Sequence, residues 1–256
     1  MAAGLFDLSG RVALVTGGSR GLGKAMARVF AENGADVVIS SRHEEELKSA
    51  LQEILEGTGR KGKYFVADVS RRDDVAHLAK ATLTEMGRVD ILVNNAGMNA
   101  PQAVEKMDDS NWDRTLEVNL TSCMALTRAL VPQMKGRKWG RVIFISSIMG
   151  LASKEERGAY SATKSALVGL TRAAALELGP FGVTVNCLSP GPFLTDMPAG
   201  VLSEDQKKVF SDRTALGRWG DPRELAGPAL LLASDAGSYI TGANVVVDGG
   251  TLCRTF

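Results

Sequence analysis

The chain has 256 residues, of which 45% are hydrophobic and 23% are charged, and its 30 basic and 29 acidic side chains leave a net charge of +1. These values exclude a disordered or fibrous chain, and the small net charge argues against a broad nucleic-acid-binding surface. No stretch approaches the roughly 18 consecutive apolar residues of a membrane helix, so no membrane association is expected. Three cysteines, Cys123, Cys187 and Cys253, show neither metal-ligand nor disulfide spacing, which favours a reducing cytoplasm and no metal site.

Apolar runs and amphipathic segments alternate along the chain. Short apolar runs predict seven strands, at residues 11–16, 35–41, 64–66, 91–94, 141–146, 183–188 and 244–247. Helical spacing between them predicts helices at 21–33, 44–56, 73–86, 111–135 (as one long helix or two), 159–178 and 222–233. Repeated strand–helix–strand units are typical of an α/β fold with a mainly parallel sheet covered on both faces. No linker divides the chain, so we expect a single domain over residues 1–256.

Residues 190–220 interrupt this alternation. The segment 190–200, PGPFLTDMPAG, contains three prolines and two glycines, and a short amphipathic stretch follows at 204–210. A long irregular connection in a compact domain is often a binding loop or lid. We therefore expect the substrate loop here, with a tolerated surface insertion as the alternative.

A glycine-rich turn, TGGSRGLG at residues 16–23, joins the first predicted strand to the first predicted helix. Glycine permits a tight turn, and the helix N-terminus offers free N–H groups to a pyrophosphate. The spacing G-x-x-x-G-x-G differs from the usual dinucleotide motif G-x-G-x-x-G, and a turn without a ligand is the alternative. An NTPase is disfavoured because Lys24 is followed by Ala25. The residues expected to contact the cofactor here are Gly17, Ser19, Arg20, Gly21, Leu22 and Gly23.

The end of the second predicted strand bears on the choice between NAD(H) and NADP(H). An acid about 20 residues beyond the turn would hold a ribose 2′-hydroxyl, whereas arginine accommodates a 2′-phosphate. The strand ends in Ser41 and Arg42, while Asp36 lies at its opposite end. Together with Arg20 in the turn, these residues favour NADP(H) over NAD(H), because arginine–phosphate contacts are strong. The alternative is that Arg42 is merely a solvated residue before the next helix.

Tyr160 and Lys164 are four residues apart in a predicted helix, which places them on one face. Such a pair alone is a weak signal, because exposed helices often carry one. Ser146 and Ser147 add weight, since they follow the fifth predicted strand, at the edge where open α/β sheets bind ligands.

These features together resemble the short-chain dehydrogenase/reductase family over nearly the whole chain. The resemblance rests on the order and spacing of TGGSRGLG, Asp68-Val69, NNAG at 94–97, Asn119, Ser147, Tyr160, Lys164, Pro190-Gly191 with Thr195, and Asp248-Gly249-Gly250. It implies a Rossmann-type, doubly wound α/β fold with a mainly parallel seven-stranded sheet. It also implies an enzyme that interconverts a ketone and a secondary alcohol, and Arg20 and Arg42 make NADP(H) the expected cofactor. A non-catalytic dinucleotide-binding regulator is the remote alternative, which the retained catalytic residues oppose.

The resemblance also implies a role for each catalytic residue. Tyr160 is the general acid/base at the substrate oxygen. The ammonium of Lys164 favours the phenolate form of Tyr160 and holds the hydroxyls of the nicotinamide ribose. Ser147 hydrogen-bonds the substrate carbonyl and orients it. Asn119 holds a water that relays protons to Lys164.

The remaining cofactor contacts implied by the resemblance fall in three segments. Those at the adenine are Asp68 and Val69, and those beside the adenosine ribose are Asn95, Ala96 and Gly97, with Asn94 more structural. Those that close over the nicotinamide are Pro190, Gly191, Phe193 and Thr195. The family often has an aliphatic residue at the position of Phe193. Asp248-Gly249-Gly250 is expected to be a structural turn and subunit contact.

Two branches of the family fit the sequence. LFDLSGR at 5–11 and RTALGRWGDPREL at 213–225 resemble gluconate 5-dehydrogenases, which interconvert a keto-sugar acid and its hydroxy form. The motif set equally resembles 3-oxoacyl-[acyl-carrier-protein] reductases, and an acidic carrier protein requires a basic patch near the pocket mouth. Candidates for that patch are Lys135, Arg137 and Lys138, with Arg128 and Arg172. Of these substrates, a sugar acid or a general ketone is favoured over a carrier-protein thioester.

The expected partners are a small carbonyl or alcohol substrate and further copies of the chain. Segments after Gly97, between Ser147 and Tyr160, and in the substrate loop are expected to form the pocket. They offer Met98, Asn99, Met149, Leu151, Lys154, Arg157, Met197 and Phe210, with Arg213 as a further carboxylate-binding candidate. The resemblance implies a homotetramer, and small apolar residues at 166–175 suit close helix packing.

Overall fold

A computed structural model describes residues 4–195 and 203–253. Its centre is a sheet of seven parallel strands in the order β3-β2-β1-β4-β5-β6-β7, which confirms the predicted fold class. The strands are β1 (Val12–Thr16), β2 (Asp36–Ser41), β3 (Gly62–Val66), β4 (Ile91–Asn94), β5 (Gly140–Ile145), β6 (Val183–Pro190) and β7 (Asn244–Val247). The order reverses between β1 and β4, so a crevice is expected outside the carboxyl ends of these two strands.

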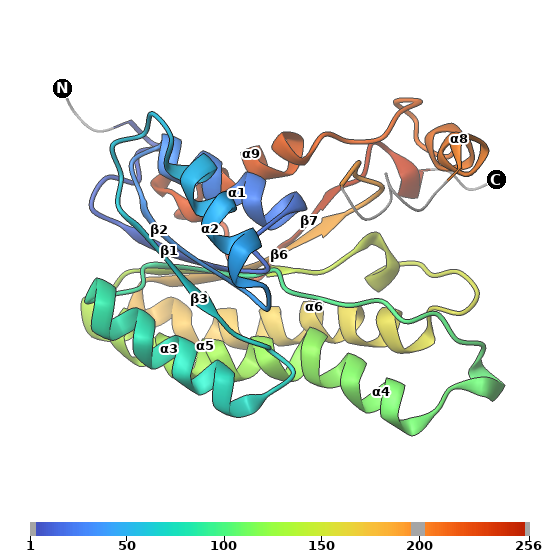
Figure 1. Cartoon of the computed structure of the whole chain (residues 1–256), viewed down its shortest axis with the longest axis horizontal. Coiled ribbons are helices and arrows are strands. Elements are labelled where there is room, and N and C mark those ends of the chain that lie inside the picture. The colour runs from blue at the N-terminus through green and yellow to red at the C-terminus, as the bar shows by residue number, and fades with distance from the viewer. Residues whose placement is uncertain (1–3, 196–202, 254–256) are drawn as a thin grey trace.

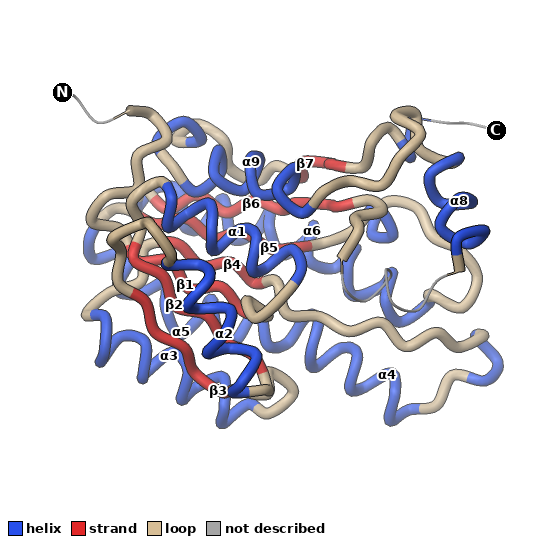
Figure 2. Tube along the Cα trace, turned by 45° about the horizontal axis from the view of Figure 1, so that its top comes forward, coloured by secondary structure: helices blue, strands red, loops and turns tan. Residues whose placement is uncertain are grey.

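Helices cover both faces of the sheet (Figures 1 and 2). One face carries α1 (Gly21–Glu32), α2 (Glu44–Leu55) and α9 (Pro222–Ala233), and the other carries α3 (Arg72–Met86), α5 (Ser122–Arg137) and α6 (Gly158–Leu178). Two further helices, α4 (Asp109–Leu116) and α8 (Glu204–Asp212), extend beyond the carboxyl edge of the sheet. Among the described residues, no helix is both long and apolar enough to cross a membrane.

The pleat of the central strand explains the two layers. Every residue of β1 is buried, and alternate side chains point to opposite faces. Ala13 and Val15 join the core beneath α1 and α9, whereas Val12 and Leu14 join the core above α3, α5 and α6. A continuous apolar run is therefore what this strand requires, since neither face meets water.

The segment predicted as one or two helices at 111–135 differs in an informative way. α4 and α5 are joined without a break in helical backbone by a π-helical turn at Glu117–Thr121. A π turn inserts one extra residue into the helical repeat, which apolar spacing does not reveal. This turn contains Asn119, so the irregularity lies at a predicted catalytic residue.

Candidate active site

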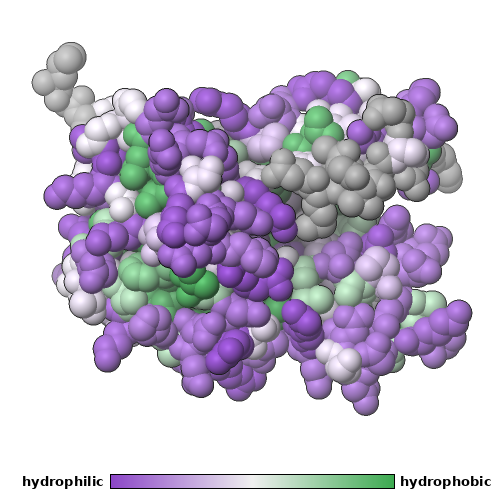
Figure 3. Space-filling model, in the orientation of Figure 1, coloured by the Kyte–Doolittle hydropathy of each residue, from purple (hydrophilic) through white to green (hydrophobic). Residues whose placement is uncertain are grey.

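A cavity of about 350 Å³ lies beyond the carboxyl ends of β1, β2, β3 and β4. Figure 3 shows the molecular surface hollowed between the part that carries α8 and the part that carries α4. The cavity is lined by the glycine turn, by residues at and after the strand ends, and by three helical elements: Gly17, Ser19, Arg20, Ser40, Ser41, Arg42, His43, Glu46, Ala67, Asp68, Val69, Asn95, Ala96, Gly97, Met98, Arg114 and Val118. Predicted cofactor residues from four separate segments thus come together at one site.

The glycine turn is shaped for close approach of a ligand to the backbone. Gly17 and Gly21 have φ values of +64° and +54°, which side chains rarely tolerate. A Cβ atom on Gly23 would lie 2.3 Å from the carbonyl oxygen of Gly17, so only glycine fits there. The amide of Asn95 donates to the carbonyl oxygens of Thr16 (2.9 Å) and Gly17 (3.1 Å). Asn95 therefore fixes the turn as well as lining the cavity, a structural role that the sequence did not reveal.

The end of the cavity beside β2 has polar groups without partners. The hydroxyl oxygens of Ser40 and Ser41 are buried and form no hydrogen bond in the described structure. Among the described residues, the guanidinium groups of Arg20 and Arg42 form no hydrogen bond or ion pair. Buried hydroxyls are normally hydrogen-bonded, so this arrangement fits an anionic, multiply accepting group such as a phosphate.

Two charged residues of this cavity were missed by the sequence analysis. Glu46, in the first turn of α2, accepts a hydrogen bond from the hydroxyl of Ser19 at 3.2 Å. Arg114, from α4, also lines the cavity. The second strand itself ends without an acid, and Glu46 belongs to the helix that follows it. The start of the following helix, four residues beyond Arg42, was the available signal for Glu46.

Asp68 and Val69 follow β3 and line the cavity, as the family resemblance implied. Burial alone would raise the pKa of Asp68. Hydrogen bonds from the backbone N–H of Ser70 (2.9 Å) and from its hydroxyl (2.8 Å), with the positive charges of Arg42 and Arg114, outweigh burial and lower that pKa. Asp68 is consequently a carboxylate with one oxygen held by Ser70.

Helix α6 carries Tyr160 and Lys164 on one face. Lys164 is only 4% exposed, and its Nζ donates a 2.7 Å hydrogen bond to the carbonyl oxygen of Ile145, the last residue of β5. The same Nζ lies 5.6 Å from the centre of the Tyr160 ring. One of the three N–H donors of the ammonium is therefore used by the protein, which leaves two for a ligand. The Tyr160 hydroxyl has no hydrogen-bond partner within the described part of the chain.

Asn119 is fully buried and fixes its surroundings from the π turn. Its amide oxygen accepts from the N–H of Met98 (2.8 Å), and its amide nitrogen donates to the Met98 carbonyl (2.9 Å) and to the Thr163 hydroxyl (3.2 Å). A Cβ atom on Gly97 would lie 3.4 Å from the Asn119 amide oxygen and 3.5 Å from Lys164 Nζ. The structure thus brings Asn119, Gly97 and Lys164 together.

The two serines after β5 have different surroundings. Ser146 donates its hydroxyl proton to the carbonyl of Lys164 at 2.7 Å, so it ties α6 to the strand. Ser147 instead accepts from the N–H of Met149 at 3.1 Å, and its own proton has no acceptor among the described residues. Ser147 is therefore the serine able to donate to a substrate oxygen, which is the role that the family resemblance implied for it.

The chain matches known proteins over most of its length. The family model described as Enoyl-(Acyl carrier protein) reductase matches residues 17–251. The 3-oxoacyl-[acyl-carrier-protein] reductase FabG from Chlamydia muridarum is 39% identical over 243 residues, which are 95% of this chain and 98% of that protein. The chain belongs to the short-chain dehydrogenase/reductase family. The resemblance predicted from its motifs is confirmed.

Solved structures of short-chain dehydrogenases/reductases share the whole fold. One is assigned as an NAD(P)-dependent gluconate 5-dehydrogenase from Beutenbergia cavernae with NADP bound at low occupancy. It has 38% identity and a TM-score of 0.92, over 98% of this chain and all of that one. Another is a 3-oxoacyl (acyl-carrier-protein) reductase from Agrobacterium tumefaciens with NADP bound, at 33% identity and a TM-score of 0.92 over 97% of each chain. The two branches suggested by the sequence are therefore both represented among similar structures.

The predicted nicotinamide segment begins at the end of β6. Gly191 packs against Asp248, and a Cβ on Gly21 would lie 3.3 Å from the Thr195 methyl group, so Thr195 lies over the glycine turn. The Phe193 ring is buried against Gly220, which leaves only its backbone available for the cofactor. Asp248 forms the expected structural turn, accepting from the N–H groups of Gly250 and Leu252, both at 2.8 Å. Met197 and the rest of 196–202 lie outside the described residues.

The basic patch proposed for a carrier protein is misplaced. Lys135, Arg137 and Lys138 directly precede β5, so they lie at the amino edge of the sheet, opposite the cavity. Arg137 is committed there to the carbonyl of Val89 (2.9 Å) and the carboxylate of Asp90 (3.3 Å). In a parallel sheet, residues before a strand and residues after it lie at opposite edges. Residues that precede β5 therefore cannot border a cavity at the carboxyl ends of the strands.

Proposed function

We propose that the chain is an NADP(H)-dependent oxidoreductase that interconverts a ketone and a secondary alcohol. The observation that carries this proposal is the pair of unpartnered guanidiniums, Arg20 and Arg42, beside the orphaned hydroxyls of Ser40 and Ser41. These groups fit the 2′-phosphate, and the glycine turn fits the pyrophosphate. Two similar structures contain NADP, which supports the same cofactor here.

The residues beyond the cofactor cavity supply the proton chemistry. When bound, the cofactor donates or accepts the hydride. Tyr160, whose hydroxyl is unpartnered, transfers the proton at the substrate oxygen, and Ser147 donates its free proton to that oxygen and holds it in place. Lys164 uses its two remaining N–H donors for the ribose hydroxyls. Asn119, buried in the π turn, completes the set as the holder of the relay water.

The substrate is proposed to be a ketone that carries an anionic group, with a keto-sugar acid as the first candidate. Lys154 lies over the ring of Phe210, with its Nζ 5.8 Å from the ring centre, so two predicted pocket residues from β5–α6 and α8 come together. A 3-oxoacyl thioester is the second candidate, because several curated relatives are named for that activity. Lys135, Arg137 and Lys138 lie at the amino edge, so they do not support the binding of a carrier protein at the cavity. Arg128 and Arg172 are exposed and remain candidates for that contact.

Initial rates of NADPH oxidation over three ketones test this function: 5-ketogluconate, an acetoacetyl thioester and an aromatic diketone. Selective turnover of 5-ketogluconate supports the keto-sugar acid. Preference for the thioester assigns the second candidate. Tight NADPH binding with no turnover of any ketone contradicts the reductase proposal and favours a dinucleotide-binding regulator.

We further propose that the chain acts as a single-domain subunit of a homotetramer in the cytoplasm. A groove of about 340 Å³ between α5 and α6 is lined by apolar side chains that include Met124, Val131 and Leu170, and Leu176 on α6 is exposed. This surface supports helix packing between subunits. The three cysteines are free thiols, which fits a reducing compartment. Sedimentation analysis of the purified chain tests the tetramer.

A further inference from the structure

The phosphate end of the cofactor cavity contains an acid that a strictly NADP(H)-selective site does not need. Glu46 lines the cavity together with Arg20 and Arg42, and it lines an adjoining hollow together with Ser19 and Arg20. Its carboxylate accepts a 3.2 Å hydrogen bond from the hydroxyl of Ser19. Ser19 belongs to the glycine turn and is 8% exposed. The hydroxyl of Ser19 therefore donates to a carboxylate of the protein itself.

The position of Glu46 is set by the fold. The next residue, Leu47, is fully buried, and Ala50 one turn later is also in the core, so the first turn of α2 is anchored. The side chain of Glu46 extends from this anchored turn toward the glycine turn. Among the described residues, Glu46 forms no ion pair that would neutralise it.

One carboxylate at this place acts oppositely on the two forms of the cofactor. A 2′-phosphate brings negative charge next to Glu46 and competes with it for the Ser19 hydroxyl. A 2′-hydroxyl instead can donate a hydrogen bond to the carboxylate, as acids do in sites that hold an unphosphorylated ribose. Arg20 and Arg42 attract the phosphate, whereas Glu46 opposes it.

We propose that Glu46 is a cofactor-specificity residue that lowers the preference for NADP(H) and makes NAD(H) a second usable cofactor. This inference rests on the proposed dinucleotide site. The carboxylate is exposed to solvent, so its effect is screened by water and salt. We expect Glu46→Gln to tighten NADPH binding about fivefold and to weaken NADH binding about threefold.

The test is calorimetric titration of NADPH and of NADH into wild type, Glu46→Gln and Glu45→Gln. Glu45 is the matched control because it is adjacent, does not line the cavity and pairs with Lys48 at 2.7 Å. The proposal predicts that the ratio of the two dissociation constants changes by about fifteenfold in Glu46→Gln and less than about twofold in Glu45→Gln. The change in NADPH affinity is also expected to shrink at high salt.

Three outcomes overturn the proposal: an unchanged ratio in Glu46→Gln, an equal change in Glu45→Gln, or a change of opposite sign. Failure of the proposed function gives a different result. If wild type binds NADH but not NADPH, the NADP(H) preference is wrong, whereas loss of NADH affinity in Glu46→Gln still supports the role of Glu46. If it binds neither nucleotide, both proposals fail.

Discussion

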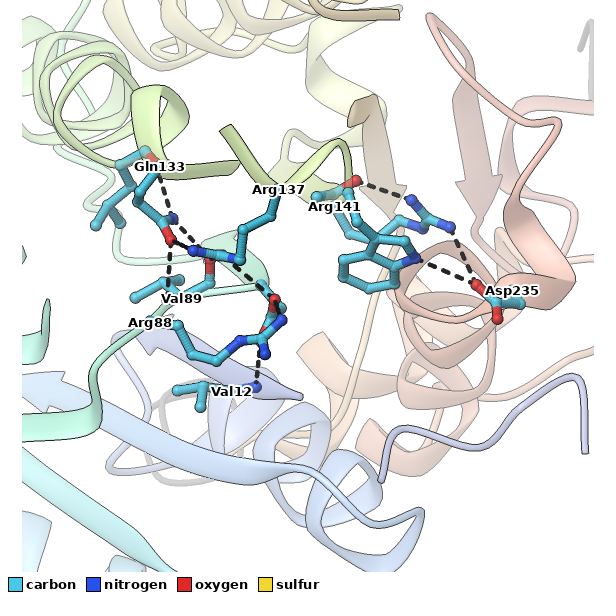
Figure 4. Close-up of polar contacts among 11 residues, drawn as sticks. Val12, Arg88, Val89, Gln133, Arg137, Arg141 and Asp235 are labelled. Carbon is cyan, nitrogen blue, oxygen red and sulfur yellow. Dashed lines mark hydrogen bonds and ion pairs between the residues drawn. The ribbon is translucent and has the colours of Figure 1, made fainter. Parts of the chain in front are cut away.

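The two edges of the sheet treat their charged groups in opposite ways. At the amino edge, the fully buried carboxylate of Asp90 accepts from Arg88 (2.5 Å), from Arg137 (3.3 Å) and from the N–H of Val12 (2.9 Å), and Figure 4 shows this cluster beside Gln133. At the carboxyl edge, the guanidiniums of Arg20 and Arg42 have no such partner among residues 4–195 and 203–253. Charge is used to hold elements together at one edge and is left available at the other.

A second amino-edge cluster follows the same pattern. Arg141, 3% exposed, donates to Asp235 (3.4 Å) and to the carbonyl of Gly140 (2.9 Å), as Figure 4 shows. Its guanidinium lies over the Trp139 ring at 4.2 Å, and that of Arg11 lies over the same ring at 3.7 Å. Burial lowers the pKa of Arg141 to about 10, against the opposing effect of Asp235. The cost of burying this cation is thus offset by contacts from several elements.

The contrast between the two edges indicates where a ligand binds. Burying a hydroxyl without a hydrogen-bond partner costs about 1–3 kcal/mol, so such groups persist where a ligand repays the cost. Ser40 and Ser41 are such groups, and they adjoin the unpartnered Arg42. The carboxyl edge gathers its unpartnered groups around one cavity, which a bound molecule can complete. In the Asp90 cluster the carboxylate is paired with both guanidiniums, although the Nε atoms of Arg88 and Arg137 form no hydrogen bond among the described residues.

The largest expected effect is on catalysis at the carboxyl edge. Tyr160→Phe removes the proton donor and should lower kcat about 10²–10⁴-fold, the usual contribution of general acid–base catalysis. NADPH affinity should stay within about twofold, since the ring remains. Tyr239→Phe is the matched control because that tyrosine is fully exposed. Steady-state kinetics with the preferred ketone provide the measurement, and full activity in Tyr160→Phe would exclude its catalytic role.

The next effect concerns stability at the amino edge. Asp90→Ala leaves the Val12 N–H and two guanidiniums without their acceptor, so the free energy of unfolding should fall by about 3 kcal/mol. Glu85→Ala, which breaks an exposed pair with Lys63, should change it by less than about 1 kcal/mol. Urea unfolding of both variants measures the difference. Equal stabilities would show that the amino-edge cluster does not hold the fold.

A smaller effect separates the two cofactors. Arg42→Ala should weaken NADPH binding about tenfold or more, because a charge-assisted hydrogen bond contributes about 1.5–3 kcal/mol. NADH lacks the 2′-phosphate, so its affinity should change by less than about twofold. Fluorescence titration with each nucleotide makes the comparison within one variant. Equal losses for both would overturn the assignment of Arg42.

The smallest expected effect, that of Ser40→Ala on NADPH affinity, tests the contrast between the edges most specifically. Ser40→Ala removes a hydroxyl that lacks a partner, so the ligand-free protein should keep its stability or gain up to about 1 kcal/mol. NADPH affinity should nevertheless fall about threefold, from the loss of one neutral hydrogen bond. Thermal unfolding with and without NADPH reports both quantities. A clear loss of stability without ligand would mean that Ser40 has a structural partner.

Much of the fold was predictable because its signals are local. The apolar run of β1, the glycine turn and the spacing of Tyr160 and Lys164 each act within one element or across one junction. The π turn around Asn119 was not predictable, because its extra residue leaves the apolar pattern unchanged. The Ser19–Glu46 contact joins residues 27 positions apart on different elements, and no local pattern reports such a pair.

Phosphorus NMR of bound NADP⁺ tests the central claim most directly, because it observes the 2′-phosphate itself. A free phosphate monoester takes up its second proton near pH 6, and nearby positive charge favours the dianion. If Arg20 and Arg42 hold the 2′-phosphate, its resonance in the complex should remain that of the dianion down to about pH 5. A bound nucleotide whose 2′-phosphate titrates near pH 6, as it does in free solution, would contradict the account.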